Sequence, residues 1–297
     1  QLYAGGTGTA LITTQGMPTC ELGLLLVITG LLFKLAAAPF HMWSPDVYEG
    51  APTSVTAYFM MVPKIAFMGA LVRVLYGACY DFMETWQTAI VIASAVSMIV
   101  GAFAALVQTR LKRLLALSSV GHVGFMLAAL STGTPEGVQA MFLYLFVYTC
   151  MNITMFTYIL GNHQGGQSPR LVTDLTGIGA TQPLVALTLC VVWFSMAGIP
   201  PLAGFYSKAM VFYSAVAGHM NSLAVLGVLT SVVSCFYYIR VIKVMYFETS
   251  STWPEAPRMS YISACIQACS VVVLVCLMMY PAPIESLAQR LALCVCA

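Results

Sequence analysis

Charged residues are scarce in this chain, and their scarcity excludes an ordinary water-soluble protein. Only 7% of the 297 residues are charged, whereas 60% are hydrophobic and the mean hydropathy is +0.89. A soluble domain carries about 25% charged residues, which keep its surface hydrated. The net charge of +2 is too small to favour a nucleic-acid partner, and no basic stripe with interleaved aromatic residues occurs. The composition therefore predicts a protein whose solvent is lipid.

Motifs for metals, redox cofactors and nucleotides are also lacking. No C-x-x-C pair occurs among the ten cysteines, and thiols inside apolar runs, such as those of Cys265 and Cys269, behave as small hydrophobic groups. The glycine-rich stretch at 5–8 lacks the strand–helix context of a dinucleotide site, and no phosphate-binding loop is present. We therefore expect no flavin, nicotinamide, metal or iron–sulfur cluster in this chain.

Long apolar runs dominate the sequence. Each is close to the roughly 20 residues with which a helix crosses a bilayer. The bilayer interior offers no water to backbone groups, so these runs should be helical. The pattern predicts an all-α, polytopic bundle with about eight transmembrane segments, at residues 21–42, 54–77, 87–108, 113–131, 137–160, 182–218 (interrupted), 222–245 and 261–282.

Basic residues are concentrated in alternate connections. If every segment crosses once, the links after the first, third, fifth and seventh segments share one side of the membrane. Seven Lys and Arg residues lie on that side, against Arg73 and Arg290 on the other. Such a bias marks the cytoplasmic side, or the matrix side in a mitochondrion. The seven are Arg110, Lys112, Arg113, Arg170, Arg240, Lys243 and Arg258.

Two of the segments are interrupted at related positions. Residues 33–39 read FKLAAAP and residues 194–200 read FSMAGIP, an offset of 161 that matches Phe, Ala and Pro. Proline removes a backbone donor and clashes with the preceding turn, so each helix should break there. Paired broken helices indicate an ion site in transporters built from repeats, although Pro and Gly are also common in ordinary membrane helices. The matched register favours a repeat.

Three lysines fall inside the apolar segments. Lys34 precedes the first break, Lys64 lies near the middle of its segment, and Lys208 follows the second break. One lysine at the bilayer centre costs about 2.5–3.5 kcal/mol, so all three should face a hydrated or protein-lined interior with partners. A buried amine can exchange a proton when a nearby charge changes, which makes the three lysines candidate proton carriers. The alternative is that they extend to the headgroups.

His122 is a fourth candidate, because an imidazole exchanges protons near neutral pH. Its neighbours Ser118 and Ser119 could hold water, but a histidine that only packs is an equally good interpretation. Tyr144 and Tyr148 could add hydroxyl groups, although tyrosine often serves only for packing. The remaining histidines lie beside a polar loop or in loops and are assigned no role: His41, His163 and His219.

Several motifs in the same order resemble one family, the antiporter-like subunits of proton-pumping respiratory complex I. The resemblance runs from about residue 1 to 285 and is closest to subunit 2 of that complex, in its mitochondrial and plant-like versions. The motifs are FKLAAAPFHMWSPDVYEGAPT at 33–53, QTRLKRLLA at 108–116, SSVGHVG at 118–124, AGIPPLAGF at 197–205 and CFYYIR at 235–240.

The resemblance implies two inverted five-helix repeats, each with a discontinuous helix. We expect the end of the first repeat at 1–80, the second repeat at 81–248, and a C-terminal helix and tail at 249–297. Lys34, Lys64 and Lys208 match family lysines on a hydrated axis through the membrane. The resemblance further implies proton translocation coupled to NADH:ubiquinone electron transfer in the mitochondrial inner membrane. FMN, iron–sulfur clusters and ubiquinone would then belong to other subunits.

The chain departs from the family at its start, where about five helices are expected to be missing. One of them would carry the glutamate that pairs with the lysine matched by Lys34. We therefore expect a separate polypeptide to supply these helices, with other membrane-arm subunits and lipids such as cardiolipin as further partners. If those helices are lost altogether, the proton path is incomplete. A cation/proton antiporter subunit and a structural membrane brace are the alternative functions.

Overall fold

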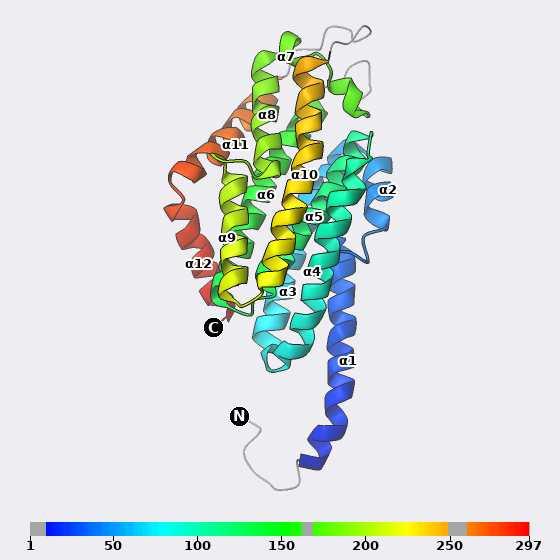
Figure 1. Ribbon diagram of the computed structural model, residues 1–297, viewed down its shortest axis with the longest axis vertical. Coiled ribbons are helices and arrows are strands. Elements are labelled where there is room, and N and C mark those ends of the chain that lie inside the picture. The colour runs from blue at the N-terminus through cyan, green and yellow to red at the C-terminus, as the bar shows by residue number, and fades with distance from the viewer. Residues whose placement is uncertain (1–9, 162–168, 249–259, 297) are drawn as a thin grey trace.

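The computed structural model describes residues 10–161, 169–248 and 260–296, and within these ranges all regular secondary structure is helical. The long helices run side by side along the longest axis of the molecule (Figure 1). The predicted all-α bundle is therefore confirmed. The α-helices are α1 (Ala10–Leu35), α2 (Trp43–Gly50), α3 (Thr53–Val72), α4 (Met83–Leu106), α5 (Leu111–Leu130), α6 (Pro135–Gly161), α7 (Ile178–Thr181), α8 (Pro183–Ala197), α9 (Ala203–Ala217), α10 (Asn221–Phe247), α11 (Tyr261–Met279) and α12 (Ala282–Cys296), with a π-helix η1 (Arg73–Ala78) and 3-10 turns η2 (Tyr80–Phe82) and η3 (Val172–Leu175).

Six of the described helices are long and apolar enough to cross a membrane. They contain α3 with η1, η2 with α4, and α5, α6, α10 and α11. Helix α8 is apolar but shorter, and it is followed by α9 after a break. Because the spanning helices satisfy their backbone hydrogen bonds internally, a lipid environment can be tolerated along their whole length. The chain is a multi-pass membrane protein.

Helix α5 forms the centre of the bundle. Nearly all of its residues are buried, and it packs against α2, α4, α6 and α9. Its approach to α4 depends on glycine: a Cβ atom added to Gly101 would lie 2.6 Å from the backbone Cα of Gly121. Small residues let membrane helices approach closely. This tight crossing therefore sets how closely α4 and α5 approach each other.

Substitution of Gly101 by alanine should destabilise the bundle, because the added methyl group would meet a backbone that cannot move aside. We expect a loss of about 1–3 kcal/mol, the usual cost of overpacking. Gly69 in α3 has nothing within 4 Å of an added Cβ, so Gly69→Ala is the matched control and should be neutral or slightly stabilising. Thermal unfolding in detergent measures both variants, and equal midpoints would contradict the tight crossing.

The connections predicted to lie on the basic side meet at one end of the bundle. The backbone N–H of Leu111 donates to the carbonyl of Arg170 at 2.8 Å, which joins the link after α4 to the link after α6. Arg240, in the last part of α10, donates to the carbonyl of Leu106 at 2.8 Å. This end of α10 lies beside α7 in Figure 1. The predicted grouping is confirmed for these residues, whereas Arg258 and His163 lie outside the described residues.

The two helix breaks have the same backbone geometry. Helix α1 ends at Leu35 and α8 ends at Ala197; the next residues, Ala36 and Gly198, adopt left-handed conformations with φ of 57° and 83°. The hydrogen bonds that close the last turns also correspond: Ala36 to Phe33 with Gly198 to Ser195, and Ala37 to Leu32 with Ile199 to Phe194. Each of these residues at the second break lies 162 positions after its counterpart at the first break. The offset of 161 deduced from residue types is therefore wrong by one residue, because the left-handed residue, not the proline, sets the end of each helix.

A serine hydroxyl completes the hydrogen bonding at each break. The backbone N–H of Ala38 donates to Ser97 Oγ at 2.8 Å, and the N–H of Gly204 donates to Ser195 Oγ at 3.1 Å. Such partners are needed where an interrupted helix frees backbone groups inside a membrane protein. Ser97 comes from α4, so the first break is fastened to the neighbouring helix.

Two boundaries differ from the predictions. The first segment was expected to continue to residue 42, but α1 ends at Leu35 and the short helix α2 follows from Trp43. The residues after 282, expected to form a tail, instead form α12, which packs against α6 and buries Ala288 and Ala292. An apolar stripe spaced four residues apart stabilises such a short helix through packing.

Candidate functional site

Lys64 lies near the middle of α3 with only 2% of its surface exposed. Its Nζ donates to the hydroxyl of Tyr148, on α6, at 2.9 Å. The same amine lies 4.9 Å from the centroid of the Tyr148 ring, where an aromatic face stabilises a cation. Lys64 is therefore enclosed by protein, as predicted, and does not extend to a membrane surface.

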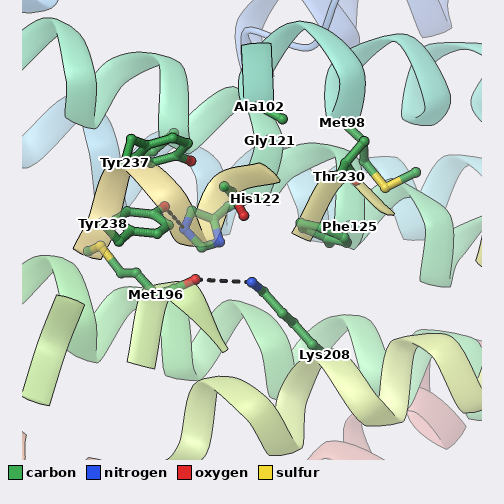
Figure 2. A pocket seen from close by; sticks show the side chains of 12 residues that line it. Met98, Ala102, Gly121, His122, Phe125, Met196, Lys208, Thr230, Tyr237 and Tyr238 are labelled. Atoms are coloured by element: carbon green, nitrogen blue, oxygen red, sulfur yellow. Dashed lines mark hydrogen bonds between the residues drawn. The ribbon is translucent and has the colours of Figure 1, made fainter. Parts of the chain in front are cut away.

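Lys208, in α9, is 5% exposed and turns its amine back toward the end of α8. Nζ donates to the carbonyl oxygens of Met196 at 3.1 Å and Ala197 at 2.8 Å. Figure 2 shows the first of these bonds. The last carbonyls of a helix have no partner within the helix and carry partial negative charge. The second break thus leaves these carbonyl oxygens free to accept hydrogen bonds from the amine. The centroid of the Phe125 ring lies 5.3 Å from Nζ.

His122 is 3% exposed and lies on the central helix α5. Both ring nitrogens are paired: Nδ1 lies 2.8 Å from the hydroxyl of Tyr144 on α6, and Nε2 lies 3.1 Å from that of Tyr238 on α10. The Tyr148 ring, whose hydroxyl binds Lys64, lies with its centroid 5.3 Å from that of the imidazole. Lys208 lines the same small cavity as His122. The structure therefore brings three of the four predicted site residues into one cluster, named here the buried basic cluster.

A small cavity of about 10 Å³ adjoins the buried basic cluster. This volume holds roughly one water molecule. Its walls combine groups that can exchange hydrogen bonds with apolar side chains, and Figure 2 shows Lys208 and His122 facing it from different helices. The lining residues are Met98, Ala102, Ser118, Gly121, His122, Phe125, Met196, Lys208, Thr230, Ser234, Tyr237 and Tyr238.

Carboxylates are absent from the buried polar residues of the described ranges. Lys64 and Lys208 are therefore stabilised by a hydroxyl, by helix-end carbonyls and by aromatic faces, without a neighbouring anion in the described part of the chain. A buried charge without a paired opposite charge is costly. Such amines respond strongly to any charge or water that approaches them, which is the property expected of groups that load and release protons.

Lys34 is not part of the buried basic cluster. It lies in the last turn of α1 and is exposed. Helix α1 stands at the edge of the bundle (Figure 1) and packs against α3 and α4. The expectation that all three lysines are enclosed is therefore not met for Lys34 within this chain, because the described helices cover only one side of α1.

Tyr238 was missed by the sequence reasoning, although it bonds directly to His122. The tyrosine pair in CFYYIR offered a signal, because two adjacent tyrosines within an apolar segment bring two hydroxyl groups into the membrane. Helical periodicity does not show which of the two faces α5. His41 is buried at the first break, and its Nδ1 has no hydrogen-bond partner among the described residues. His219 lies in the turn before α10, apart from the cluster.

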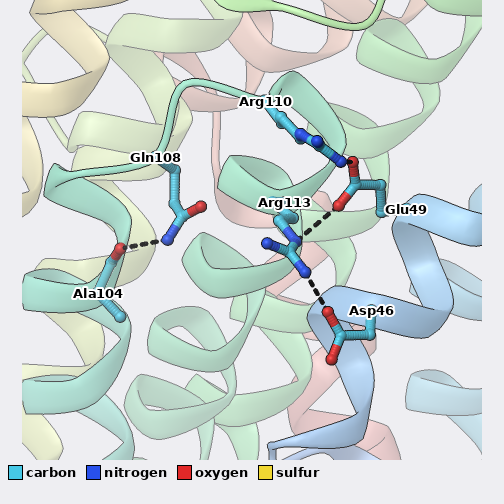
Figure 3. A network of polar contacts seen from close by, with 6 residues as sticks. All are labelled: Asp46, Glu49, Ala104, Gln108, Arg110 and Arg113. Carbon is cyan, nitrogen blue, oxygen red and sulfur yellow. Dashed lines mark hydrogen bonds and ion pairs between the residues drawn. The ribbon is translucent and has the colours of Figure 1, made fainter.

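A second polar cluster fastens α2 to the start of α5. Arg113 pairs with both Asp46 and Glu49, and its Nε lies 2.6 Å from Glu49 Oε2. Arg110 also pairs with Glu49, as Figure 3 shows. These residues are partly exposed, at the end of the bundle where the basic links meet. Lys112 adds a hydrogen bond to the carbonyl of Ala51 at 2.9 Å. The cluster holds α2 against the start of α5.

Gly198 leaves the space that Lys208 occupies. A Cβ atom on Gly198 would lie 2.8 Å from Lys208 Cδ and 3.0 Å from its Nζ, and the residue has a φ of 83°. Both the conformation and the space therefore favour glycine. The amine reaches the end of α8 only because this side chain is missing.

Gly198→Ala should destabilise the protein more than Gly177→Ala. Both glycines have positive φ, 83° and 76°, but an added Cβ on Gly177 has nothing within 4 Å. The shared backbone strain costs about 1–2 kcal/mol, and displacement of Lys208 should add about 1–3 kcal/mol for overpacking. Thermal unfolding in detergent gives the comparison. Equal losses of stability in the two variants would show that glycine is needed at 198 only for its backbone conformation and not for the space that Lys208 occupies.

Comparison with known proteins places these features in a wider group. A family model described as "NADH:quinone oxidoreductase/Mrp antiporter, TM" matches residues 7–234, which include Lys64, His122 and Lys208. The chain is 43% identical over 291 residues to NADH-quinone oxidoreductase subunit N of Paramagnetospirillum magneticum, covering 98% of this chain and 59% of that protein. It is 44% identical over 275 residues to NADH-ubiquinone oxidoreductase chain 2 of Marchantia polymorpha, covering 93% and 55%.

The fold is similar to that of a chain in respiratory complex I from Thermus thermophilus with bound aureothin. The TM-score is 0.79 at 33% sequence identity, and the match covers 96% of this chain and 61% of that one. The chain thus spans little more than half the length of the relatives it matches.

Proposed function

The chain belongs to the NADH:quinone oxidoreductase/Mrp antiporter transmembrane family, and we propose that it is a proton-translocating, non-redox subunit of the membrane arm of respiratory complex I. The observation that carries this proposal is the buried basic cluster, in which two amines and an imidazole from three helices lie close together without a buried carboxylate in the described residues. Electron transfer from NADH to ubiquinone would occur in other subunits, which would hold FMN and the iron–sulfur clusters.

The buried basic cluster suits proton transfer that is driven by a change of charge outside this chain. Lys64 and Lys208 take up or release protons when the charge at a neighbouring subunit changes, because little else nearby screens their charge. His122 lies between them and can pass protons in either direction. The hydroxyl groups and the cavity supply the short hydrogen-bonded steps between these groups. In this role the chain contributes to the activity of a proton-translocating NADH:ubiquinone reductase.

Lys34 is proposed as a further station of the same path, with a partner at the edge of the bundle. Its exposure, together with that of Leu22, Leu26 and Phe33 on α1, suits coverage by another polypeptide that places a carboxylate beside the amine. Other membrane-arm subunits and lipids such as cardiolipin would cover the remaining apolar surface. The shared geometry of the two breaks supports division into the end of one repeat at 1–80 and a second repeat at 81–248, followed by the C-terminal part at 249–297.

The mitochondrial inner membrane is the proposed location. Its support is the likeness of the motifs to mitochondrial versions and the similarity to the Marchantia polymorpha chain. The bacterial relatives support a bacterial plasma membrane as the alternative.

Lys64→Met and Lys208→Met should each lower NADH-driven proton pumping by about tenfold or more, since a positioned proton-transfer group contributes roughly 10²–10⁴-fold. Pumping is measured as acidification of inverted membrane vesicles that contain the assembled complex. Lys243 is an exposed lysine on α10 that lies 3.7 Å from Glu248, so Lys243→Met is the matched control and should pump normally. Native electrophoresis confirms assembly. Normal pumping by both cluster variants would overturn the proposal.

A subunit of a cation/proton antiporter is the second candidate, because the description of the family model includes Mrp antiporters. Purification through a tag on this chain separates the two. A complex I subunit should co-purify with NADH dehydrogenase activity and bound flavin, whereas an antiporter subunit should co-purify with neither and should support sodium- or potassium-dependent proton exchange. A third function, a structural brace, predicts that the lysine substitutions reduce assembly but leave pumping per assembled complex unchanged.

A further inference from the structure

We propose that Tyr144 and Tyr238 are proton-relay residues, and that their hydroxyl groups pass a proton through His122 by exchanging its two neutral tautomers. This inference rests on the proposed function and adds to it a route between the two buried lysines. The geometry that points to it is the pairing of both imidazole nitrogens with tyrosine hydroxyls, at 2.8 Å for Nδ1 and 3.1 Å for Nε2.

The surroundings place the ring between these two hydroxyls. His122, Tyr144 and Tyr238 are all buried, and they come from α5, α6 and α10. The Tyr148 ring packs against the imidazole with centroids 5.3 Å apart. In this position Nδ1 faces α6 and Nε2 faces α10, so the relay has two defined ends.

The chemistry of these groups permits the exchange without a net change of charge. A neutral imidazole donates from one nitrogen and accepts at the other, and a tyrosine hydroxyl can do both. In one tautomer, Nδ1–H donates to Tyr144 Oη while Nε2 accepts from the Tyr238 O–H. The Tyr238 proton then moves to Nε2, and the Nδ1 proton moves to Tyr144 Oη. Tyr144 releases its own hydroxyl proton onward, and Tyr238 takes a replacement from its other side. One proton has crossed, and each group again carries one, but the imidazole proton is now on Nε2, so the ring turns to restore the first tautomer before a second proton follows.

The two ends of this relay lead toward the two lysines. Tyr144 and Tyr148 lie one turn apart on α6, a spacing that places side chains on one face of a helix, and Tyr148 holds the amine of Lys64. Tyr238 borders the small cavity that Lys208 also lines, as Figure 2 shows. The relay therefore spans the gap between the amine on α3 and the amine on α9.

The relay is tested by Tyr144→Phe and Tyr238→Phe in the assembled complex, measured as protons pumped per NADH oxidised in inverted vesicles. Each variant should pump substantially less, approaching the loss expected for Lys208→Met, while assembly is retained. Tyr76 is the matched control, because it is a buried tyrosine whose hydroxyl donates to the carbonyl of Leu130 at 2.8 Å, away from His122. Tyr76→Phe should pump like the parent protein.

Normal pumping by both relay variants would overturn the relay. So would an equal loss in Tyr76→Phe, because the effect would then reflect only a lost buried hydrogen bond. The proposed function fails separately: if Lys64→Met and Lys208→Met pump normally, the pump itself is refuted. If the lysine variants lose pumping and the tyrosine variants do not, only the relay is refuted.

The tautomer exchange has its own spectroscopic signature. Solid-state ¹⁵N NMR of the histidine-labelled complex, with His122→Gln used to assign the His122 signals by difference, reports the protonation of each ring nitrogen. The relay predicts a neutral imidazole with both tautomers populated, shifted toward a single tautomer in Tyr238→Phe. A doubly protonated ring, or a single tautomer that does not respond to Tyr238→Phe, would overturn it.

Discussion

The arrangement of this protein depends on the burial of two lysine amines in a bundle whose described interior contains no carboxylate. A charge in an apolar interior needs either an opposite charge or several well-placed dipoles. This chain uses dipoles: the hydroxyl and ring of Tyr148 for Lys64, and the last carbonyls of α8 with the ring of Phe125 for Lys208. Dipoles stabilise the amine less completely than an anion would. The proton on each amine is therefore sensitive to any charge that approaches it, which suits the proposed role in proton translocation.

The second break in the helices serves this arrangement directly. A continuous helix through residues 183–217 would use its carbonyls internally and could not offer any to Lys208. Gly198 ends α8 in a left-handed conformation and leaves room for the lysine side chain, and Ser195 accepts the hydrogen bond of the freed N–H of Gly204. The first break has the same backbone form, but its lysine, Lys34, lies before the break and is exposed at the edge of the bundle. Similar backbone geometry thus presents an amine to the interior at one break and to the outside of the bundle at the other.

Ion pairs at the end of the bundle where the basic links meet also hold α2 and α5 together. Ion pairs of Arg110 and Arg113 with Asp46 and Glu49 fasten α2 to the start of α5 (Figure 3). Partly exposed ion pairs contribute little stability one at a time, and a connected network contributes more. Their contribution here is positional, since α2 packs against the central helix that carries His122. The close crossing of Gly101 with Gly121 fixes that helix from its other side.

The sequence by itself determined the class of protein, the position of most of its apolar helices, and the grouping of its basic links at one end of the bundle, because each depends on composition and run length. It also singled out Lys64, Lys208 and His122, since a charge inside an apolar run has an energetic cost wherever the run is placed. It did not determine the true register of the two breaks, the edge position of Lys34, or the contact of Tyr238 with His122. Only the tertiary structure decided these, because backbone conformation and the packing of helices distant in sequence set which atoms meet. Helical periodicity assigns a residue to a face, but a hydrogen bond between α5 and α10 forms only when both helices are fixed by their other neighbours.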